Sequence, residues 1–305
     1  MMVDVLLAAY NGERHIGQQI ESLLSQTYPH WRLRIRVDGG TDNTLQICRN
    51  FADRVPDKIQ VLEDDLGNVG VLRSFNRLLA SREAPYVMFC DQDDLWLPQK
   101  IELTVAAMRQ LEQEVGASTP ILVHTDSVIV DEHLQQIAPS ALKFSHRKPY
   151  SGLGRACMEL SLYGHQVMLN DPLIKLSGSI PEGFVSWDWW FPLVAMTFGR
   201  VHRIDKSMTL WRRHREVLSH NKKHAPSTYA RMRLSDCRRK VHISLHQCEM
   251  FLDRFRDQLP PTRLAFFEGV AKIRGANFLM RRLLIIRYRL FKTGLLKTFG
   301  VLLGA

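Results

Sequence analysis

The sequence predicts an α/β protein with a doubly wound, mostly parallel sheet and a helical, basic carboxyl-terminal extension. Short β-favouring apolar runs alternate with amphipathic helical patterns through the first 118 residues. This strand–helix order is typical of parallel strands joined by crossover helices. Loops rich in Asp, Asn and Gly follow the strands, where ligands bind in such sheets.

Four strand–helix units fit this pattern in order. The predicted strands are the apolar runs 3–8, 33–37, 59–62 and 86–90. The helices that follow repeat apolar residues every three or four positions, and the fourth is expected from Pro98 to about Val115. Thr41 or Asp42 can cap the second helix. The loops expected to face one crevice are 8–13, 38–43, 63–70 and 91–94.

After about residue 120 the pattern changes. Short strands are predicted at ILVHTD, SVIVD and SLYGHQVML, and a helix around Trp189–Phe198. Residues 226–257 and 262–303 are predicted to be helical. The expected divisions are one domain at 1–225, with halves at 1–118 and 119–225, and a helical region at 226–305.

Charge is distributed unevenly along the chain. Residues 1–211 contain 20 Lys and Arg against 25 Asp and Glu, whereas residues 212–305 contain 21 against 6. A basic segment on an acidic body indicates an anionic partner, either nucleic acid or an anionic membrane leaflet. No nucleic-acid recognition motif accompanies the charge, so nucleic acid is not expected and the membrane is favoured.

Apolar and basic residues interleave in this carboxyl-terminal segment. Residues 262–305 hold nine Lys and Arg and one acidic residue, Glu268. The interleaved residues are Leu279, Leu283, Leu284, Leu290, Leu295, Leu296, Phe299 and Leu302, with Arg281, Arg282, Arg287, Arg289, Lys292 and Lys297. Such helices lie in the interface of an anionic leaflet, where each basic residue contributes about 1 kcal/mol. The alternative is a helix packed on the core with a solvated basic face.

The apolar stretches and the cysteines bear on the cellular location of the protein. No stretch reaches the roughly 18–20 apolar residues that span a bilayer, and the run Val5–Ala9 is too short for a secretory signal. The five cysteines form no C-x-x-C pair, which favours reduced thiols and argues against a zinc cluster. We therefore expect a cytoplasmic protein, peripheral on the inner face of the cell membrane.

An acidic cluster follows the fourth predicted strand. In FCDQDDLW, residues 89–96, the carboxylates of Asp91, Asp93 and Asp94 repel one another, so a positive partner is expected. A D-x-D pair at a strand end suits Mg²⁺ or Mn²⁺, which bridges carboxylates to phosphate oxygens. The alternative is a polar cap between strand and helix. The chain has neither G-x-G-x-x-G after the first strand nor a P-loop, which argues against both of those nucleotide sites.

Eight segments, one of which contains this acidic cluster, carry a family resemblance over essentially the whole chain. In order they are AAYNGERHIGQQIESLLSQTY, VDGGTDNT, NVGVLRSFNRLLA, FCDQDDLWLPQKIE, GHQVMLN, WDWWFPLVAMTFGRVHRID, LWRRHREV and RLFKTGLLKTFGVLLG. Together they resemble the family 2 inverting glycosyltransferases of GT-A fold, above all bacterial rhamnosyltransferase-like members. The resemblance implies a nucleotide-diphospho-sugar transferase fold, with a nucleotide-sugar half before the acceptor half.

The resemblance also implies roles on the donor side. Tyr10 corresponds to a base-stacking aromatic residue, Asp38 to a carboxylate that contacts base or ribose, and Asp91 to one that contacts ribose. Arg73 is expected beside them. Asp93 corresponds to the metal ligand, and His214 to a histidine that can reach the metal or the diphosphate. A solvated basic strand is the alternative for His214.

On the acceptor side, Asp188 corresponds to the general base. A carboxylate near aromatic rings can have a raised pKa that suits proton abstraction from a hydroxyl. The alternative is that Asp188 caps the helix beginning at Trp189. Trp187 and Trp189 can stack on a sugar or belong to the core, and Asp126 can border the acceptor site.

Three departures from the family pattern bear on the function. Val37 and Gly40 replace an aspartate and a serine of the usual turn, and Ala8 replaces a small hydroxyl residue. The expected function is metal-dependent, inverting transfer of a sugar from dTDP-rhamnose or a UDP-sugar to a lipid-linked glycan. Because of the departures, the alternative is a GT-A module that binds a nucleotide or glycan without transfer. A sugar nucleotidyltransferase is disfavoured, because no glycine- and lysine-bearing phosphate loop follows the first strand.

Overall fold

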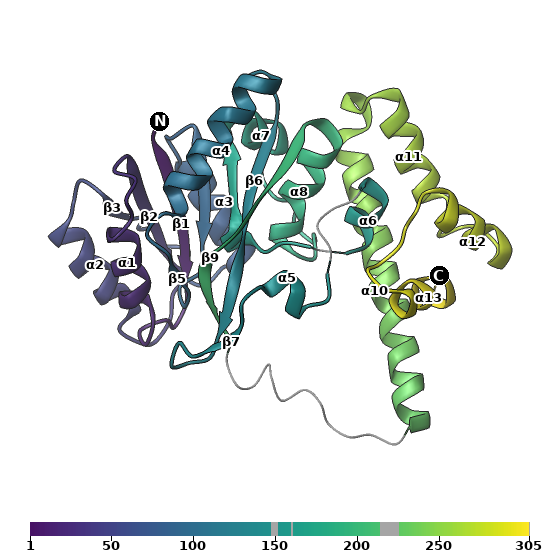
Figure 1. Ribbon diagram of the computed structural model, residues 1–305, viewed down its shortest axis with the longest axis horizontal. Coiled ribbons are helices and arrows are strands. Elements are labelled where there is room, and N and C mark those ends of the chain that lie inside the picture. The colour runs from purple at the N-terminus through teal and green to yellow at the C-terminus, as the bar shows by residue number, and fades with distance from the viewer. Residues whose placement is uncertain (148–151, 160, 214–225, 305) are drawn as a thin grey trace.

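A nine-stranded sheet forms the centre of the molecule (Figure 1). The structure, a computed structural model, describes residues 1–147, 152–159, 161–213 and 226–304. The strands follow the order β3-β2-β1-β4-β8-β6-β9-β5, and β7 pairs with β6. Their bounds are β1 Val3–Ala9, β2 Trp31–Val37, β3 Ile59–Val61, β4 Tyr86–Cys90, β5 Leu95–Trp96, β6 Ile121–Val130, β7 Gln136–Ala138, β8 Val167–Asn170 and β9 Arg200–Arg212.

The amino-terminal half of the sheet is parallel and agrees with the prediction. β1 pairs in parallel with β2 and β4, and β2 with β3. The helices between and after these strands are α1 Ile16–Leu24, α2 Thr44–Arg54, α3 Val71–Ser81 and α4 Lys100–Val115. Because all four strands run the same way, their carboxyl ends meet at one edge of the sheet.

The second half of the sheet is mixed and differs from the sequence prediction in detail. β8 is antiparallel to β4 and β6, whereas β9 is parallel to β6. The two strands predicted at ILVHTD and SVIVD are one continuous strand, β6. The predicted strand at SLYGHQVML begins only at β8, because Gly164–Gln166 forms a 3₁₀ turn. β9 was not predicted, since its first eight residues are partly exposed and mainly polar.

The helices of this half are short, apart from α8. They are α5 Ala141–Phe144, α6 Leu153–Met158, η1 Gly164–Gln166, α7 Asp171–Ser177 and α8 Trp187–Phe198. The carboxyl-terminal helices are α10 Pro226–Phe255, η2 Arg256–Gln258, α11 Pro261–Ala271, α12 Phe278–Arg287 and α13 Leu295–Gly304. The predicted helical stretch 262–303 is therefore three helices, with Asn277 capping α12 by accepting from the Met280 amide at 3.0 Å.

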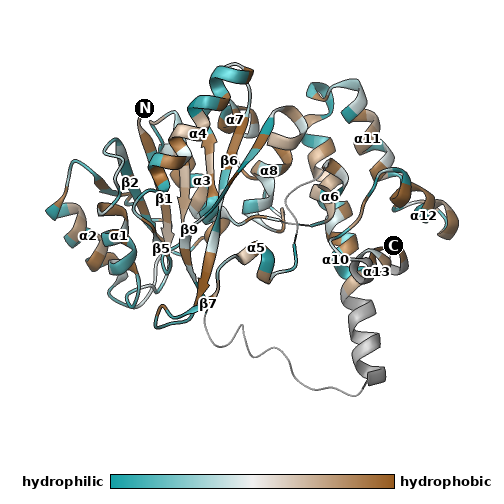
Figure 2. Ribbon diagram, in the orientation of Figure 1, coloured by the Kyte–Doolittle hydropathy of each residue, from teal (hydrophilic) through white to brown (hydrophobic). Residues whose placement is uncertain are grey.

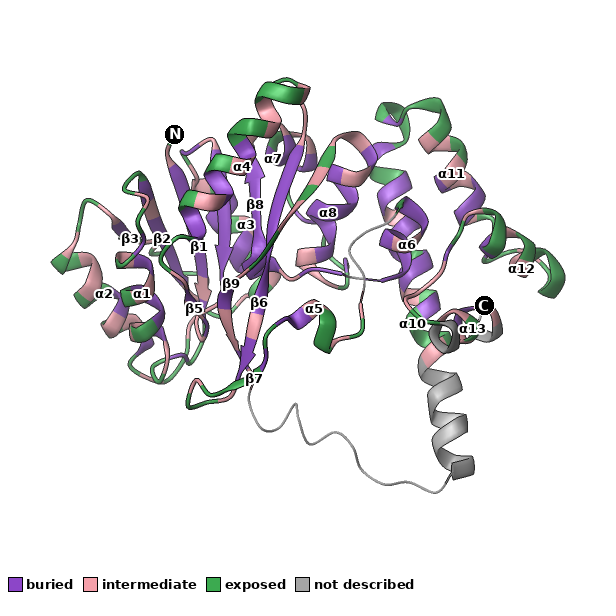
Figure 3. Ribbon diagram, in the orientation of Figure 1, coloured by how far each residue is buried: buried purple, intermediate pink, exposed green. Residues whose placement is uncertain are grey.

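Two apolar layers cover the two faces of the sheet, because successive strand residues point to opposite sides. Val3, Val5 and Leu7 of β1 pack with side chains of α1, α2 and α4. Leu6 packs on the other side, in a larger cluster that joins α3, α7 and α8 to α6 and the carboxyl-terminal helices. Figure 3 shows most of the central strands and much of α8 as buried.

The carboxyl-terminal helices contribute to the core, although parts of them were expected to face a membrane. Leu290 is fully buried and so faces the core rather than lipid, and Leu284 and Leu302 are partly buried and pack against the core cluster. Leu279, Leu283 and Phe299 are exposed as expected. Among the described residues, no helix has the length and apolar character needed to cross a bilayer.

Candidate active site

The carboxyl ends of β1, β2 and β4 enclose a hollow with the first turn of α3, called here the strand-end pocket. Its volume is ≈ 290 Å³. The residues lining it are Ala8, Ala9, Tyr10, Asp38, Val71, Ser74, Asp91, Gln92 and Asp93. Three of the four loops predicted to share a crevice contribute to it, and the fourth, 63–70, leads directly into α3.

Gln92 fixes the main chain at Tyr10. The Tyr10 amide donates to Gln92 Oε1 at 2.8 Å, and Gln92 Nε2 donates to the Tyr10 carbonyl at 3.0 Å. Tyr10 remains 50% exposed at the wall of the pocket. An aromatic ring held in this way can stack on a planar base.

Asp38 is buried and bonded to the loop before α3. Its carboxylate accepts from the Val69 and Gly70 amides, both at 2.8 Å, and from the Arg36 guanidinium. Burial opposes ionisation, but the hydrogen bonds from Val69, Arg36 and Gly70 together outweigh it and lower the pKa of Asp38. Asp38 therefore carries a negative charge in the pocket wall and also orders the loop 63–70.

The acidic cluster after β4 includes a histidine from η1. His165 Nδ1 lies 3.1 Å from Asp91 Oδ2 and 3.4 Å from Asp94 Oδ2. Burial of the His165 ring opposes its protonation, but the Asp94 and Asp91 carboxylates outweigh this and raise the pKa of His165. Burial also raises the pKa of Asp94, with a further contribution from Asp91 and Asp93. When its ring is protonated, His165 therefore supplies part of the positive charge expected beside these aspartates.

The same cluster fits a hard divalent cation. Oxygen atoms of Asp91 and Asp94 and a ring nitrogen of His165 all lie within 4.8 Å of one another. Asp94 Oδ2 is buried without a hydrogen-bond partner among the described residues, as a ligand oxygen can be. Asp93, the ligand expected from the sequence, lines the adjoining strand-end pocket. The carboxylate oxygens suit Mg²⁺ or Mn²⁺, and His165 can join them as a ligand only in its neutral form.

Two buried basic side chains hold the acidic cluster in place. Lys100 Nζ donates to the His165 carbonyl at 2.6 Å and to Thr209 Oγ1 at 2.7 Å. Burial lowers the pKa of Lys100 to about 7. Arg212, at the end of β9, donates from Nε to the Asp93 carbonyl at 2.9 Å, and its amide donates to Asp94 Oδ1 at 3.1 Å. Arg212 thus holds the acidic loop from β9, whereas Lys100 of α4 links η1, which carries His165, to β9.

Asp188 lies in the first turn of α8 and close enough to the acidic cluster to interact with it. Helix α8 begins at Trp187 with Ser186 as N-cap, so Asp188 does not cap a helix starting at Trp189. Its carboxylate accepts hydrogen bonds from the Ser186 hydroxyl and the Gly164 amide. Burial raises the pKa of Asp188, these two hydrogen bonds oppose the rise, and the charge of Asp91 adds to it.

Other side chains expected at the acceptor site lie in different surroundings. The Trp187 ring packs 4.2 Å from Phe75 and 4.8 Å from Phe89, measured between ring centroids, which places it against the core. Trp189 is buried and donates from Nε1 to the Ala156 carbonyl at 2.6 Å. Asp126 is buried and accepts from Ser140 Oγ at 2.6 Å, at the start of α5.

Arg73, which was expected on the donor side, does not line the strand-end pocket. Arg73 is exposed on α3 and forms an ion pair with Glu182 at 2.9 Å. His214 lies outside the described residues. His165 was not singled out from the sequence, although it stands in GHQVMLN, one of the segments that carry the family resemblance.

Comparison with known sequences identifies the family to which the amino-terminal half belongs. The model of the family "Glycosyl transferase family 2" matches residues 4–157, just over half of the chain. The chain is 25% identical to the Escherichia coli UDP-Glc:alpha-D-GlcNAc-diphosphoundecaprenol beta-1,3-glucosyltransferase WfgD, over 53% of this chain and 60% of WfgD. It is 35% identical to the Shigella flexneri dTDP-rhamnosyl transferase RfbG, over 32% of this chain and 34% of RfbG. The chain thus spans less than two thirds of either relative.

Solved structures of glycosyltransferases share the fold. Staphylococcus aureus TarS 1-349 in complex with UDP-GlcNAc superposes with a TM-score of 0.58 at 19% identity, covering 89% of this chain and 70% of TarS 1-349. The mannosyltransferase PcManGT from Pyrobaculum calidifontis, in complex with GDP-Man and Mn²⁺, superposes with a TM-score of 0.54 at 15% identity, covering 99% and 84%. The predicted GT-A fold is confirmed. With the family model matching residues 4–157, the chain belongs to glycosyl transferase family 2.

Proposed function

We propose that the protein transfers a sugar from a nucleotide diphosphate to a hydroxyl group of a lipid-linked glycan, with inversion at the anomeric carbon. The observation that carries this proposal is that η1 joins Asp188 to the acidic cluster: the Gly164 amide donates to Asp188, and the next residue, His165, lies 3.1 Å from Asp91. A base and a diphosphate-binding group must lie on either side of the transferred sugar for an in-line displacement.

The donor occupies the strand-end pocket. Tyr10 stacks on the base, and Asp38 and Asp91 accept hydrogen bonds from base or ribose. The names of WfgD and RfbG support UDP and dTDP as the nucleotides to be tested. Arg73 can bind the donor only if its ion pair with Glu182 opens.

Mg²⁺ or Mn²⁺ is proposed at Asp93, with Asp91, Asp94 and His165 as the neighbouring donors. When bound, the cation neutralises charge that develops on the departing diphosphate. Arg212 holds the main chain of the acidic loop and Lys100 holds the main chain at His165, so these donors need not reorganise when the donor sugar nucleotide arrives.

Asp188 acts as the general base. The carboxylate takes the proton of the acceptor hydroxyl while that oxygen attacks the anomeric carbon. The bond from the anomeric carbon to the diphosphate oxygen breaks, and the nucleoside diphosphate leaves from the opposite face. A raised pKa brings the carboxylate closer to the acidity that proton abstraction needs near neutral pH.

Replacing Asp188 and Asp93 separately tests these assignments. Asp188→Asn should reduce transfer by roughly 10²- to 10⁴-fold, the usual contribution of a general base, with UDP affinity unchanged. Asp93→Ala should reduce both transfer and Mn²⁺-dependent UDP binding. Transfer is measured as nucleotide release from UDP-sugars and dTDP-rhamnose with extracted lipid-linked acceptor, and binding by calorimetry. Wild-type transfer by Asp188→Asn would contradict the base assignment, and nucleotide binding without turnover by the wild type would support a non-catalytic module.

The partner of the carboxyl-terminal helices is proposed to be an anionic membrane leaflet. α12 exposes Phe278, Leu279, Met280, Leu283 and Ile286, the first two at 71% and 67%. Figure 2 shows α12 as a mainly hydrophobic helix, and Figure 3 shows the same helix exposed. Arg282, Arg287 and Arg289 accompany this apolar surface, a combination that suits the interface of an anionic bilayer.

A further inference from the structure

Arginine alternates with apolar residues along β2, in the sequence WRLRIRV. Because successive side chains of a strand point to opposite faces, Arg32, Arg34 and Arg36 share one face of the sheet. Arg36 is the most buried of the three, with 1% of its side chain exposed. A charged group is costly to bury unless it is paired and hydrogen-bonded, so its partners show what keeps it there.

All five N–H groups of the Arg36 guanidinium have acceptors. Nε and Nη2 donate to the two carboxylate oxygens of Asp64 at 3.0 and 2.9 Å. Nη2 also donates to the Gly67 carbonyl at 3.0 Å, and Nη1 donates to Ser74 Oγ at 2.9 Å and to Asp38 Oδ1. These acceptors belong to the loop before α3, to α3 itself and to the residue after β2. Arg36 therefore joins three parts of the chain at one point.

Two of these partners line the strand-end pocket, whereas Arg36 does not. Asp38 and Ser74 both belong to the pocket wall. The Asp38 carboxylate in turn accepts from the Val69 and Gly70 amides, both at 2.8 Å, so the wall and the loop before α3 form one network centred on Arg36. A wall that is ordered before the ligand arrives avoids the entropic cost of ordering it on binding.

We infer that Arg36 is a positioning residue for the donor nucleotide. It does not contact the nucleotide, and it acts by holding Asp38 and the first turn of α3 in the arrangement that the base and ribose meet. The inference rests on the proposed function, because it takes the strand-end pocket as the donor site. Since all five N–H groups of Arg36 are used within this network, none is left for the acidic cluster or for Asp188. The effect of Arg36 should therefore be confined to the nucleoside part of the donor.

Replacing Arg36 by lysine tests this role with the charge retained. An ammonium group has three donors and no planar fork, so it cannot bind both oxygens of Asp64 while it holds Asp38 and Ser74. Arg36→Lys should weaken the binding of UMP and UDP by the same factor, roughly tenfold. Asp64→Asn should weaken both in the same proportion, although Asp64 does not line the pocket.

Calorimetry with UMP, UDP and Mn²⁺ as separate ligands measures these effects, with dTMP and dTDP in parallel. The affinity for Mn²⁺ alone should be unchanged in both variants, because Arg36 has no contact with the proposed metal ligands. In an Asp38→Asn background, Arg36→Lys should have little further effect on UMP affinity, because it acts through Asp38. A merely structural role would instead lower all affinities together with the melting temperature.

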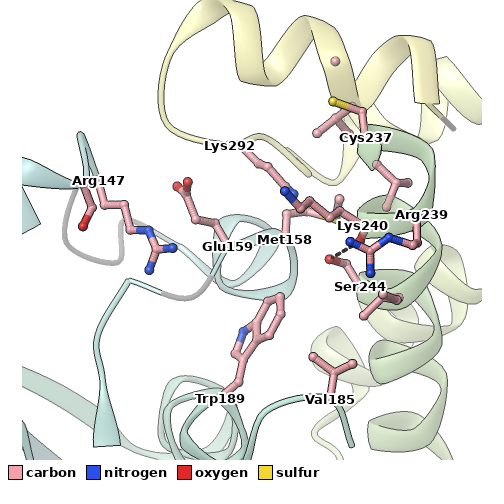
Figure 4. A pocket seen from close by; sticks show the side chains of 15 residues that line it. Arg147, Met158, Glu159, Val185, Trp189, Cys237, Arg239, Lys240, Ser244 and Lys292 are labelled. Carbon is pink, nitrogen blue, oxygen red and sulfur yellow. Dashed lines mark hydrogen bonds between the residues drawn. The ribbon is translucent and has the colours of Figure 1, made fainter. Parts of the chain in front are cut away.

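Arg34→Lys is the matched control. Arg34 lies two residues earlier on the same strand, is also buried, and pairs with Asp4 at 3.3 Å and Glu83 at 2.8 Å, none of which lines the strand-end pocket. It should lose stability as Arg36→Lys does while its UMP affinity stays at the wild-type value. Met158→Ala, in a separate cavity of ≈ 460 Å³ (Figure 4), is a second control for loss of stability alone.

The outcomes separate this inference from the proposed function. Equal UMP affinity of the wild type, Arg36→Lys and Asp64→Asn would overturn the positioning role and leave the donor site in place. An equal loss of UMP affinity in Arg34→Lys would also overturn it, because the effect would then follow stability rather than the pocket. Failure of the wild type to bind any of these nucleotides would overturn the donor assignment itself, and the inference with it.

Discussion

At the residue scale, Gly164 sets the place of the first turn of α8. A Cβ atom added to Gly164 would lie 1.8 Å from the Trp187 ring, far inside contact distance. The Gly164 amide also donates to Asp188. Only glycine lets η1 and α8 approach this closely, so the side chain next to the proposed base depends on it.

Gly164→Ala should therefore lower both stability and transfer. Moving Trp187 out of its contacts with Phe75 and Phe89 should cost about 1–3 kcal/mol, the usual range for overpacking. Thermal unfolding and nucleotide release measure the two effects. Gly275→Ala is the matched control, because its added Cβ meets no atom within 4 Å. If Gly164→Ala and Gly275→Ala have the same thermal stability and the same rate of nucleotide release, the close approach of η1 and α8 is not needed for stability or transfer.

His124 predicts a pH dependence of stability. Burial lowers its pKa from 6.5 to about 4, despite a hydrogen bond to the Thr125 carbonyl. Because the folded pKa lies below the unfolded one, the stabilisation is complete above pH 6.5 and is lost as the pH falls from 6.5 to about 4. Over that window the free energy of unfolding should decline by about 3 kcal/mol through this residue.

The measurement is urea unfolding of wild type and His124→Gln between pH 4 and 7. The variant should show a smaller decline of the unfolding free energy toward acid pH. His133→Gln replaces an exposed histidine on the same half of the chain and should retain the wild-type decline. Parallel curves for wild type and His124→Gln would show that His124 does not take up this proton on unfolding.

At the element scale, α12 is the helix to test for membrane binding. Its apolar residues are exposed, whereas Arg281 and Arg282 also bond to main-chain carbonyls near the start of the helix. Replacing those arginines would disturb the helix itself. Replacing exposed apolar residues of α12 avoids this disturbance, so these residues are the ones to change.

The triple variant Leu279→Gln, Leu283→Gln, Ile286→Gln should sediment much less with anionic liposomes than wild type. Salt should release only part of the wild-type protein, because the Debye length falls from about 10 Å at 0.1 M to about 3 Å at 1 M while apolar contacts persist. Ile137→Gln, an exposed apolar residue on β7, is the control. Unchanged sedimentation of a folded triple variant would show that α12 does not bind the membrane.

At the scale of the whole molecule, the carboxyl-terminal helices and α8 share one core. Trp190 packs on Phe255 at 5.6 Å and on Phe251 at 5.7 Å, between ring centroids. Phe251 and Phe255 are fully buried. Removing the helices would expose these contacts beside the proposed base, since Trp190 follows Asp188 by two residues.

A chain ending at residue 225 should therefore fail to fold stably or to bind UDP. Loss of the cooperative thermal transition and elution as aggregate would be the expected results. A monomeric 1–225 chain with wild-type UDP affinity would show instead that the predicted boundary separates an independent domain.

The amino-terminal half of this fold follows from local sequence. The alternation of apolar runs with helical periodicity predicted β1 to β4 to within two residues at each end, and a helix after each of these strands, because side-chain period is a local property. Since parallel strands bring their carboxyl ends together, the same pattern predicted a crevice near Asp38, Asp91 and Asp93.

The rest was decided by contacts between distant parts of the chain. His165 meets Asp91 across 74 residues, and Arg212 reaches Asp93 across 119. No local pattern encodes these pairings, since the first depends on β8 pairing with β4 and the second on β9 entering the sheet beside β6. The basic carboxyl-terminal segment shows the same limit, because its sequence allowed either a membrane-facing helix or a core helix. Tertiary packing buried Leu290 and exposed Leu279, as only one face of each helix could reach the core.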